Sequence, residues 1–226
     1  MVILGMILMA SIQVTRFYHR SQMQRIEQQV SRAQTELKLL KTQISPHFLF
    51  NTLNNIYGLA YMGDPRAANM ISKLAQIMRY LLDDCEQPRV PLDKERDLVN
   101  QYLALQQLRF EGNKNIDFYH AGVQHSHSIV PMVLINFVEN CFKHSDLDTN
   151  PDAWIKITME VEDNVLHFRS QNTIRKVRVE RERNQPGIGL TNSIKLLESN
   201  YPGNFNLQTE VTDHVFQLEV TINMNV

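Results

Sequence analysis

The stretch ISPHFLFNTLNNI at residues 44–56 places a histidine directly after a proline and four residues before an asparagine. Pro46 suits the first turn of a helix, where its missing N–H has no intrahelical partner to lose. In such a helix His47, Asn51 and Asn54 share one face. An unshifted imidazole is roughly three-quarters neutral at pH 7, so a ring nitrogen is available as a nucleophile for a group delivered by a second domain.

The same helix has an apolar side, which decides how the histidine can be interpreted. Leu49, Leu53, Ile56 and Ala60 form a stripe at helical spacing and are expected to pack. A histidine beside apolar residues is more often a structural group than a reactive one. The spacing alone therefore favours a structural histidine.

A second group of polar residues lies in PMVLINFVENCFKHS, residues 131–145, which reads as an amphipathic helix. Its polar arc consists of Asn136, Glu139, Asn140, Lys143 and His144, and its apolar arc consists of Leu134, Phe137, Val138, Cys141 and Phe142. An ordinary solvated face carries long charged side chains, whereas this one has two asparagines one turn apart. Amide oxygens suit Mg²⁺, which is usually shared with substrate phosphates.

The third element is GIGLTN at residues 187–192. Gly187 and Gly189 let the backbone approach a phosphate, and the next helix offers unpaired N–H groups at its start. Asn192 is expected to cap that helix. A lone G-x-G is more often a turn. The basic residues of the preceding stretch, 173–186, fit either a lid over phosphates or an exposed loop.

These three elements occur in the order found in a known family. PHFLFN at 46–51 resembles the phosphoacceptor box of the LytS/YehU-like sensor histidine kinases. Residues 131–145 resemble the N box of the GHKL (Bergerat) ATPase fold, and GIGL-x-N resembles its second glycine box. The resemblance implies that His47 accepts the γ-phosphoryl group of ATP and that Asn51 orients its ring.

The resemblance also implies the nucleotide ligands. Asn140 is the expected Mg²⁺ ligand, Asn136 assists it, and Lys143 and His144 face the phosphates. The remaining ATP-binding positions are Asn172, Gly187, Gly189, Leu190 and Asn192. The chain departs from the pattern at two places. Phe48 follows the histidine where other histidine kinases have an acid, and SQNT replaces the first glycine box. Asn172 stands where an aspartate is expected, and its amide oxygen can accept from adenine N6.

The N-terminal residues differ in composition from the rest of the chain. Residues 2–15 carry no charge, a run shorter than the ~20 residues that cross a bilayer. Basic residues follow from Arg16, so the positive-inside rule puts the rest of the chain in the cytoplasm. We expect residues 1–17 to be the end of a transmembrane helix in the inner (cytoplasmic) membrane. A buried or interfacial helix is the alternative.

Residues 18–44 and 45–110 are expected to form helices that pair two chains. Apolar residues alternate at spacings of three and four from Met23 to Ile44, as in a parallel coiled coil. Gly63-Asp64-Pro65 ends one helix and starts another, with Asp64 as a cap. In the second helix an apolar stripe runs from Ala67 to Leu82. Two such hairpins make a four-helix bundle.

Residues 111–226 alternate between strand and helix patterns. Strands are expected near 116–118, 154–161, 165–170, 205–211 and 214–222, and helices near 131–145 and 190–200. A tight turn at Asp163-Asn164 joins two of the strands. The expected fold class is thus α + α/β: a membrane and coiled-coil helix, a dimerising hairpin, and a GHKL α/β sandwich.

Composition limits the remaining function classes. The net charge of −1 gives no reason to expect nucleic-acid binding. Cys85 and Cys141 match no metal or redox spacing and are expected to be reduced thiols.

The resemblance implies a homodimeric kinase that uses ATP and Mg²⁺ to phosphorylate His47. The phosphoryl group would then pass to an aspartate on a response regulator, often of the LytTR type. The alternative is a membrane-anchored dimeric scaffold whose nucleotide domain no longer turns over. An ATPase that only hydrolyses is less favoured, because Asn136 stands where such enzymes place a glutamate base. The stimulus, the partner's identity and the choice between cis and trans transfer stay open.

Overall fold

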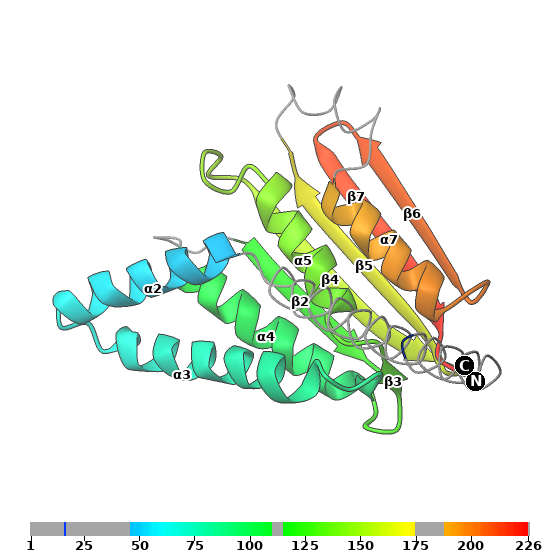
Figure 1. Ribbon diagram of the computed structural model, residues 1–226. Coiled ribbons are helices and arrows are strands. Elements are labelled where there is room, and N and C mark those ends of the chain that lie inside the picture. The colour runs from blue at the N-terminus through cyan, green and yellow to red at the C-terminus, as the bar shows by residue number, and fades with distance from the viewer. Residues whose placement is uncertain (1–15, 17–45, 110–114, 175–187, 226) are drawn as a thin grey trace, which may run out of the picture. The chain divides into compact units, whose positions relative to one another are not determined.

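The computed structural model describes residues 16, 46–109, 115–174 and 188–225 (Figure 1). The predicted coiled coil, 18–44, and all of the predicted membrane segment except Arg16 lie outside these residues. No helix within the described ranges is both long and apolar enough to cross a membrane. Residues His47–Val226 form one compact unit. Its elements are α2 (Pro46–Tyr61), α3 (Arg66–Arg79), η1 (Tyr80–Asp84), β1 (Val90–Pro91), α4 (Leu92–Arg109), β2 (Asn115–Ala121), β3 (Ser128–Ile129), α5 (Val133–His144), β4 (Trp154–Glu162), β5 (Val165–Thr173), α7 (Ile188–Asn200), β6 (Phe205–Thr212) and β7 (Val215–Asn223).

Helices α2 and α3 form the predicted hairpin. Gly63 has a positive φ of 70°, which glycine adopts without a steric penalty, and the chain reverses there. Asp64 Oδ1 accepts a hydrogen bond from the Arg66 N–H at 2.9 Å, which confirms Asp64 as a cap of α3. At its C-terminal end α3 widens into one π-helical turn, η1, which carries Tyr80.

The buried face of α2 differs from the predicted stripe. Phe48, Thr52 and Ile56 are buried, whereas Leu53 is 51% exposed and Ala60 is also exposed. The expectation that Leu49, Leu53, Ile56 and Ala60 form a packed face was therefore wrong for Leu53 and Ala60, whereas Ile56 is buried and Leu49 is half-buried. The physical reason is an aromatic contact, because Phe48 stacks on Tyr102 of α4 and turns its own face of the helix inward.

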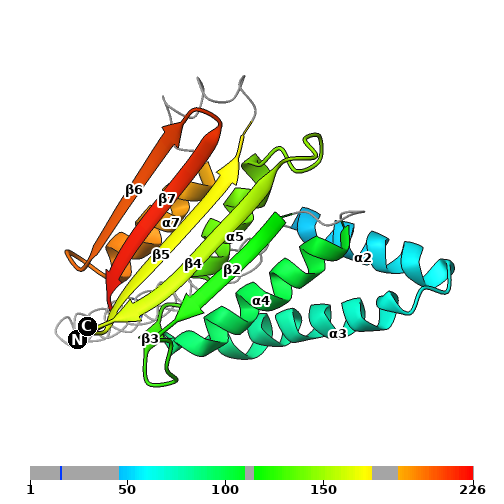
Figure 2. The ribbon, with the colours of Figure 1, turned by 180° about the vertical axis from the view of Figure 1, so that it is seen from behind.

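The second part of the unit is a two-layer α/β sandwich. Its five-stranded sheet has the order β2-β4-β5-β7-β6, with β2 parallel to β4 and the other neighbours antiparallel. Helices α5 and α7 lie against one face of the sheet (Figure 1), and the opposite face is turned toward the viewer in Figure 2. Asp163 and Asn164 both have positive φ, as a two-residue turn between twisted antiparallel strands requires.

The core of the sandwich lies between the sheet and these helices. Along β7, alternate side chains point into this core, and they are Phe216, Leu218, Val220 and Ile222. Phe137 of α5 and Phe168 of β5 are each 1% exposed, with ring centroids 5.9 Å apart. The fold-class prediction of a helical hairpin followed by an α/β sandwich is confirmed for the described residues.

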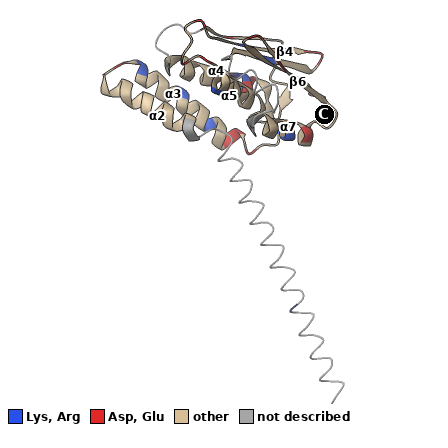
Figure 3. Ribbon diagram, turned by 90° about the horizontal axis from the view of Figure 1, so that it is seen from above, with Lys and Arg blue, Asp and Glu red and all other residues tan. Residues whose placement is uncertain are grey.

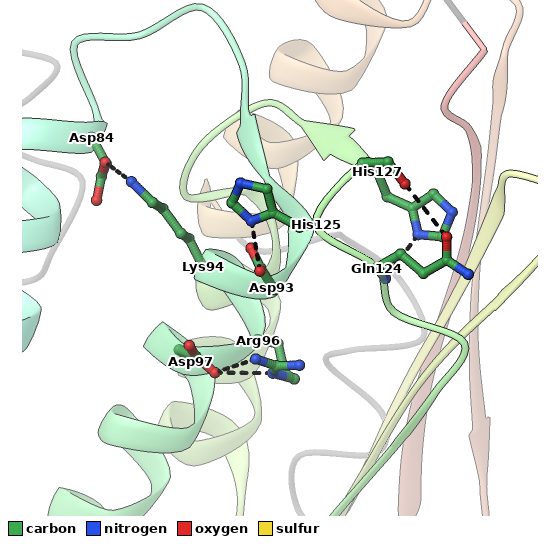
Figure 4. Close-up of polar contacts among 9 residues, drawn as sticks. Asp84, Asp93, Lys94, Arg96, Asp97, Gln124, His125 and His127 are labelled. Atoms are coloured by element: carbon green, nitrogen blue, oxygen red, sulfur yellow. Dashed lines mark hydrogen bonds and ion pairs between the residues drawn. The ribbon is translucent and has the colours of Figure 1, made fainter.

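Helix α4 connects the two parts, because it packs against both α3 and α5. Just before it, β1 pairs with β3. An ion pair and a hydrogen bond link its first turn to neighbouring segments at the surface. Lys94 pairs with Asp84 of η1 at 2.6 Å, and His125 Nδ1 lies 2.8 Å from Asp93 Oδ2 (Figure 4). The predicted domain limits of 45–110 and 111–226 stay predictions.

Candidate nucleotide and phosphoryl-transfer site

Helix α5 carries the first group of candidate ligands. It starts after Met132, whose φ of 69° is left-handed, and its apolar side chains, such as Phe137 and Cys141, are buried in the sandwich. Asn136 and Asn140 are partly exposed on the other arc. The predicted polar arc is completed by Glu139, Lys143 and His144, which are also partly or fully exposed. The amphipathic division of α5 is confirmed, and its asparagines lie where a ligand can reach them.

The start of α5 is fixed by Glu95 of α4, which our sequence analysis missed. Glu95 is 0% exposed. Its Oε1 accepts from the Met132 N–H at 2.7 Å and its Oε2 from the Leu134 N–H at 3.2 Å. The Tyr80 hydroxyl donates a third hydrogen bond to Oε1. Glu95 therefore satisfies N–H groups that the first turn of a helix leaves without partners.

Burial raises the pKa of Glu95, although its hydrogen bonds from Tyr80, Met132 and Leu134 act in the opposite direction. One sequence signal could have identified this residue. Glu95 occupies a helical stripe that is otherwise apolar, together with Leu92, Val99 and Tyr102. An acid in such a stripe needs buried donors.

Asn172, near the end of β5, is the predicted adenine ligand and is 0% exposed. Its Nδ2 donates to the Thr173 carbonyl at 3.1 Å, while its Oδ1 is buried without a hydrogen-bond partner. The opposite amide orientation would set oxygen against oxygen, so this one is fixed. Asp146 also binds Thr173, the residue that accepts from Asn172. Its carboxylate accepts a hydrogen bond from Thr173 Oγ1 at 2.5 Å, and its backbone N–H donates to the Thr173 carbonyl at 3.3 Å.

A buried acceptor without a partner is uncommon in folded proteins, and it costs free energy until a donor arrives. At Asn172 the missing partner is a hydrogen-bond donor. The exocyclic amino group of adenine is such a donor, so the residue fits the nucleobase that the sequence implied.

The second glycine box lies only partly in the described residues. Gly187 and residues 175–186 of the stretch considered as a lid, 173–186, are outside them. Gly189 and Leu190 lie in the first turn of α7, and Leu190 is 6% exposed. Asn192 is exposed at the fifth residue of α7. The prediction that Asn192 caps this helix was therefore wrong, because a cap at that position requires a helix that begins at residue 193, whereas α7 begins at Ile188.

The phosphoacceptor box begins α2. His47 is the second residue of that helix, as predicted, and Asn51 lies one turn further on and is partly exposed. Nothing of the His47 side chain is described. The next residue, Phe48, is buried and stacked on Tyr102, which in turn contacts Phe142 of α5. The helix with the predicted acceptor and the helix with the predicted Mg²⁺ ligand thus both contact the Tyr102 ring of α4.

Neither cysteine belongs to this chemistry. Cys85 and Cys141 are both buried and unpaired, as expected for reduced thiols. Burial raises the pKa of each thiol to about 12. Because the thiolate is the reactive form, both residues act as small core side chains.

Comparison with known proteins shows what this chain is similar to. Residues 35–114 match the family model described as "Histidine kinase". The chain is 28% identical over 146 residues to the sensor protein LytS of Bacillus cereus and 32% identical over 135 residues to the sensor histidine kinase/phosphatase LytS of Staphylococcus aureus. These alignments cover 65% and 59% of this chain.

A solved structure described as a bacterial phosphotransferase matches 81% of the chain and 94% of its own length, with a TM-score of 0.50 and 11% sequence identity. At that identity the match supports the fold alone. The chain spans only 25% and 23% of the length of the two curated relatives. Its sequence nevertheless aligns with both of them and, over residues 35–114, with the family model, and these similarities support a LytS-like sensor histidine kinase.

Proposed function

We propose that this chain is the catalytic part of a sensor protein that phosphorylates its own His47 with ATP and Mg²⁺. The observation that carries the proposal is the buried, unpartnered Oδ1 of Asn172. A sandwich that only supported other domains would gain nothing from a buried acceptor without a hydrogen-bond partner. A nucleobase with a donor in the matching place relieves that cost.

The fixed amide orientation favours adenine over guanine. Asn172 Nδ2 is already used by the Thr173 carbonyl, so the side chain offers only an acceptor. Adenine presents an amino group at C6, whereas guanine presents a carbonyl oxygen there. An oxygen facing Asn172 Oδ1 would be repelled, and we expect GTP to bind more weakly than ATP.

Phosphate binding is assigned to α5 and to the start of α7. The Asn140 amide oxygen is the proposed Mg²⁺ ligand, with Asn136 beside it. Lys143 and His144 complete this side of the site. The backbone of Gly187, Gly189 and Leu190, with Asn192 nearby, is proposed to hold the phosphates. The cation, when bound, neutralises charge on the phosphate oxygens, while the residues of the chain position the reacting groups.

The chemistry proposed for His47 is an in-line displacement. A neutral ring nitrogen forms a bond to the γ-phosphorus, the bond to the β,γ-bridging oxygen breaks, and ADP leaves. Asn51 is proposed to orient the ring. The phosphoryl group then passes to an aspartate carboxylate of a response regulator, which we expect to carry a LytTR-type DNA-binding domain. The chain itself is not expected to bind nucleic acid.

The hairpin supports a homodimer. Exposed apolar side chains gather on α2, α3 and η1, and they include Phe50, Leu53, Tyr57, Ile71 and Leu82. Helix α2 has no Asp, Glu, Lys or Arg, and the hairpin is drawn mostly tan in Figure 3. Covering this surface with a second hairpin would remove apolar area from water. We propose residues 18–44 as a coiled coil and 1–17 as the end of an inner-membrane anchor.

A membrane-anchored scaffold without turnover is the second candidate. It is favoured by SQNT, which lacks the glycines of the first glycine box. The two functions differ in one outcome, because the scaffold would bind ATP without forming a phosphoprotein.

The proposal is tested by incubating the chain with γ-³²P-labelled ATP and Mg²⁺. We expect the wild-type chain to become labelled and to lose that label in acid. The His47→Gln variant should carry no label. The Asn140→Ala variant should show neither Mg²⁺-dependent ATP binding nor label. ATP binding by the wild-type chain without any label would select the scaffold. Full labelling of His47→Gln would remove His47 from the mechanism.

A further inference from the structure

Resting on the proposed kinase activity, we infer that Phe48 is a positioning residue that docks the acceptor helix onto the nucleotide-binding part of its own chain. The consequence is that phosphoryl transfer to His47 occurs in cis, within one polypeptide. The inference starts from the residue that replaces the acid found after the histidine in other histidine kinases.

Phe48 is 8% exposed, and its ring stacks on Tyr102 of α4 with centroids 4.7 Å apart and planes 29° apart. Tyr102 is 2% exposed and meets Phe142 of α5 edge-on, with centroids 5.6 Å apart and planes at 71°. Both arrangements are favourable for aromatic pairs. Two consecutive ring contacts therefore join α2 to α5 through α4.

These contacts tie the reacting groups to one chain. Phe48 follows His47 directly, and neighbouring Cα atoms are about 3.8 Å apart, so a fixed Phe48 fixes the backbone of His47. Phe142 precedes Lys143 on the helix that carries Asn136 and Asn140. The contact thus places the start of the acceptor helix at the phosphate-binding helix of the same polypeptide.

Tyr102, the α4 residue in the contact with Phe48, is itself held in place by further interactions of α4. Gln106 Nε2 donates to the Tyr102 hydroxyl at 2.9 Å within the buried region. About two turns earlier on the same helix, Glu95 joins α4 to the first turn of α5. Tyr102 is therefore a fixed surface on which Phe48 can dock.

Dimerisation does not compete with this contact, because α2 uses opposite faces for the two purposes. Phe48, Thr52 and Ile56 lie on the face buried against the rest of the chain. Phe50 and Tyr57 lie on the far side of the helix, 67% and 72% exposed. A second chain can cover the exposed face while Phe48 stays docked. Transfer between chains would instead require Phe48 to leave Tyr102.

Mixed dimers separate the two modes. The chains carry different tags, and two affinity steps isolate the mixed dimer before labelled ATP is added. We pair a wild-type chain with a chain that carries both His47→Gln and Asn140→Ala. Cis transfer predicts that the wild-type chain is labelled at its usual rate per chain, whereas trans transfer predicts no label.

The reciprocal pair combines one chain with His47→Gln and one with Asn140→Ala. Cis transfer predicts no label on either chain. Label on the Asn140→Ala chain at half or more of the wild-type rate overturns the inference. If no mixed dimer can be isolated, a dilution series that extends below the concentration at which the dimer dissociates replaces it. Cis transfer predicts a first-order rate constant that is independent of protein concentration, and a rate constant that falls on dilution contradicts it.

Failure of the inference is distinguishable from failure of the proposed function. A wild-type dimer without any label refutes the kinase itself. A labelled wild-type dimer that follows the trans pattern refutes only the cis assignment.

Substitutions test the positioning role of Phe48. Phe48→Leu keeps an apolar side chain but removes the stacked ring, and we expect kcat for labelling to fall about tenfold or more because the acceptor is misplaced. KM for ATP should stay within about twofold, since the nucleotide site is not changed. Tyr102→Ala should have the same effect. Tyr102→Phe, which keeps both ring contacts, and Phe48→Tyr should restore the rate. An unchanged kcat in Phe48→Leu, or an effect confined to KM, overturns the role.

Discussion

The hairpin and the sandwich differ in how far they bury their large apolar side chains. In the sandwich, rings such as Phe137, Phe168 and Tyr201 are at most 1% exposed. Of the exposed large hydrophobic side chains in the described residues, all but Tyr119 lie between Phe50 and Leu82. The sandwich therefore completes its core within one chain, whereas the hairpin does not.

The difference shows which task each region can perform alone. A closed core gives α5 and β5 fixed positions, as binding of a small ligand requires. An open apolar face calls for a partner, and a second copy of the hairpin fits it. Helix α2 combines both situations, because the face that carries Phe48 is buried within the chain and the face that carries Phe50 is exposed.

The largest expected effect comes from opening the closed core. Phe137→Ala should lower the free energy of unfolding by about 3–5 kcal/mol, because it leaves a cavity beside Phe168. The matched change on the open face, Tyr57→Ser, should change the unfolding free energy of the monomer by less than about 0.5 kcal/mol while weakening self-association. Urea denaturation measures the unfolding free energy, and sedimentation measures the self-association. Equal losses of stability would contradict the comparison.

The next effect concerns the buried link between the two regions. Glu95→Ala leaves the Tyr80 hydroxyl and two N–H groups of α5 without an acceptor, which should cost about 3 kcal/mol of unfolding free energy. Glu95→Gln retains one acceptor oxygen and should cost less. Urea denaturation of the three proteins measures this order, and a fully stable alanine variant would show that the link is unimportant.

A smaller effect is expected at Asn172. Asn172→Leu removes the unpartnered acceptor, while the Thr173 carbonyl keeps the Asp146 N–H as a donor. The nucleotide-free protein should change in unfolding free energy by less than about 1 kcal/mol. ATP affinity should fall about tenfold, or about 1.4 kcal/mol. Calorimetric titration measures the affinity, and urea denaturation of the nucleotide-free variant is the control for folding. Unchanged ATP affinity in the leucine variant would place adenine elsewhere.

The smallest effect is a pH dependence. Burial raises the pKa of Glu95 above its ordinary value of 4.5 in the folded protein. Its contribution to stability is therefore full below about pH 4.5 and is lost as the pH rises through the folded pKa. Above pH 4.5 the wild-type protein should lose unfolding free energy relative to Glu95→Gln. Parallel stability curves for the two proteins would contradict the raised pKa.

Local patterns predicted much of this structure. The amphipathic arcs of α5, the Asp64 cap and the Asp163-Asn164 turn depend on neighbouring residues, and the sequence contains those residues. Periodicity also located every strand of the five-stranded sheet. The roles of His47, Asn136, Asn140 and Asn172 stay predictions that rest on the family resemblance.

Contacts between distant parts of the chain could not be read from local patterns. Helix α2 has two apolar faces, and only Tyr102, far along the chain, decides that the Phe48 face is the buried one. Glu95 has its partners more than thirty-five residues away at Met132 and Leu134. Asn192 was wrongly predicted to cap α7, because the helix begins earlier than its apolar pattern indicated.

The central claim is that the closed domain transfers phosphate to the histidine at the start of the open hairpin. The most direct measurement is peptide mapping by mass spectrometry at neutral pH after incubation with ATP and Mg²⁺. The account predicts a phosphoryl group on the imidazole of His47 in the wild-type chain and none in Asn140→Ala. Phosphate on any other residue, with His47 unmodified, would contradict it.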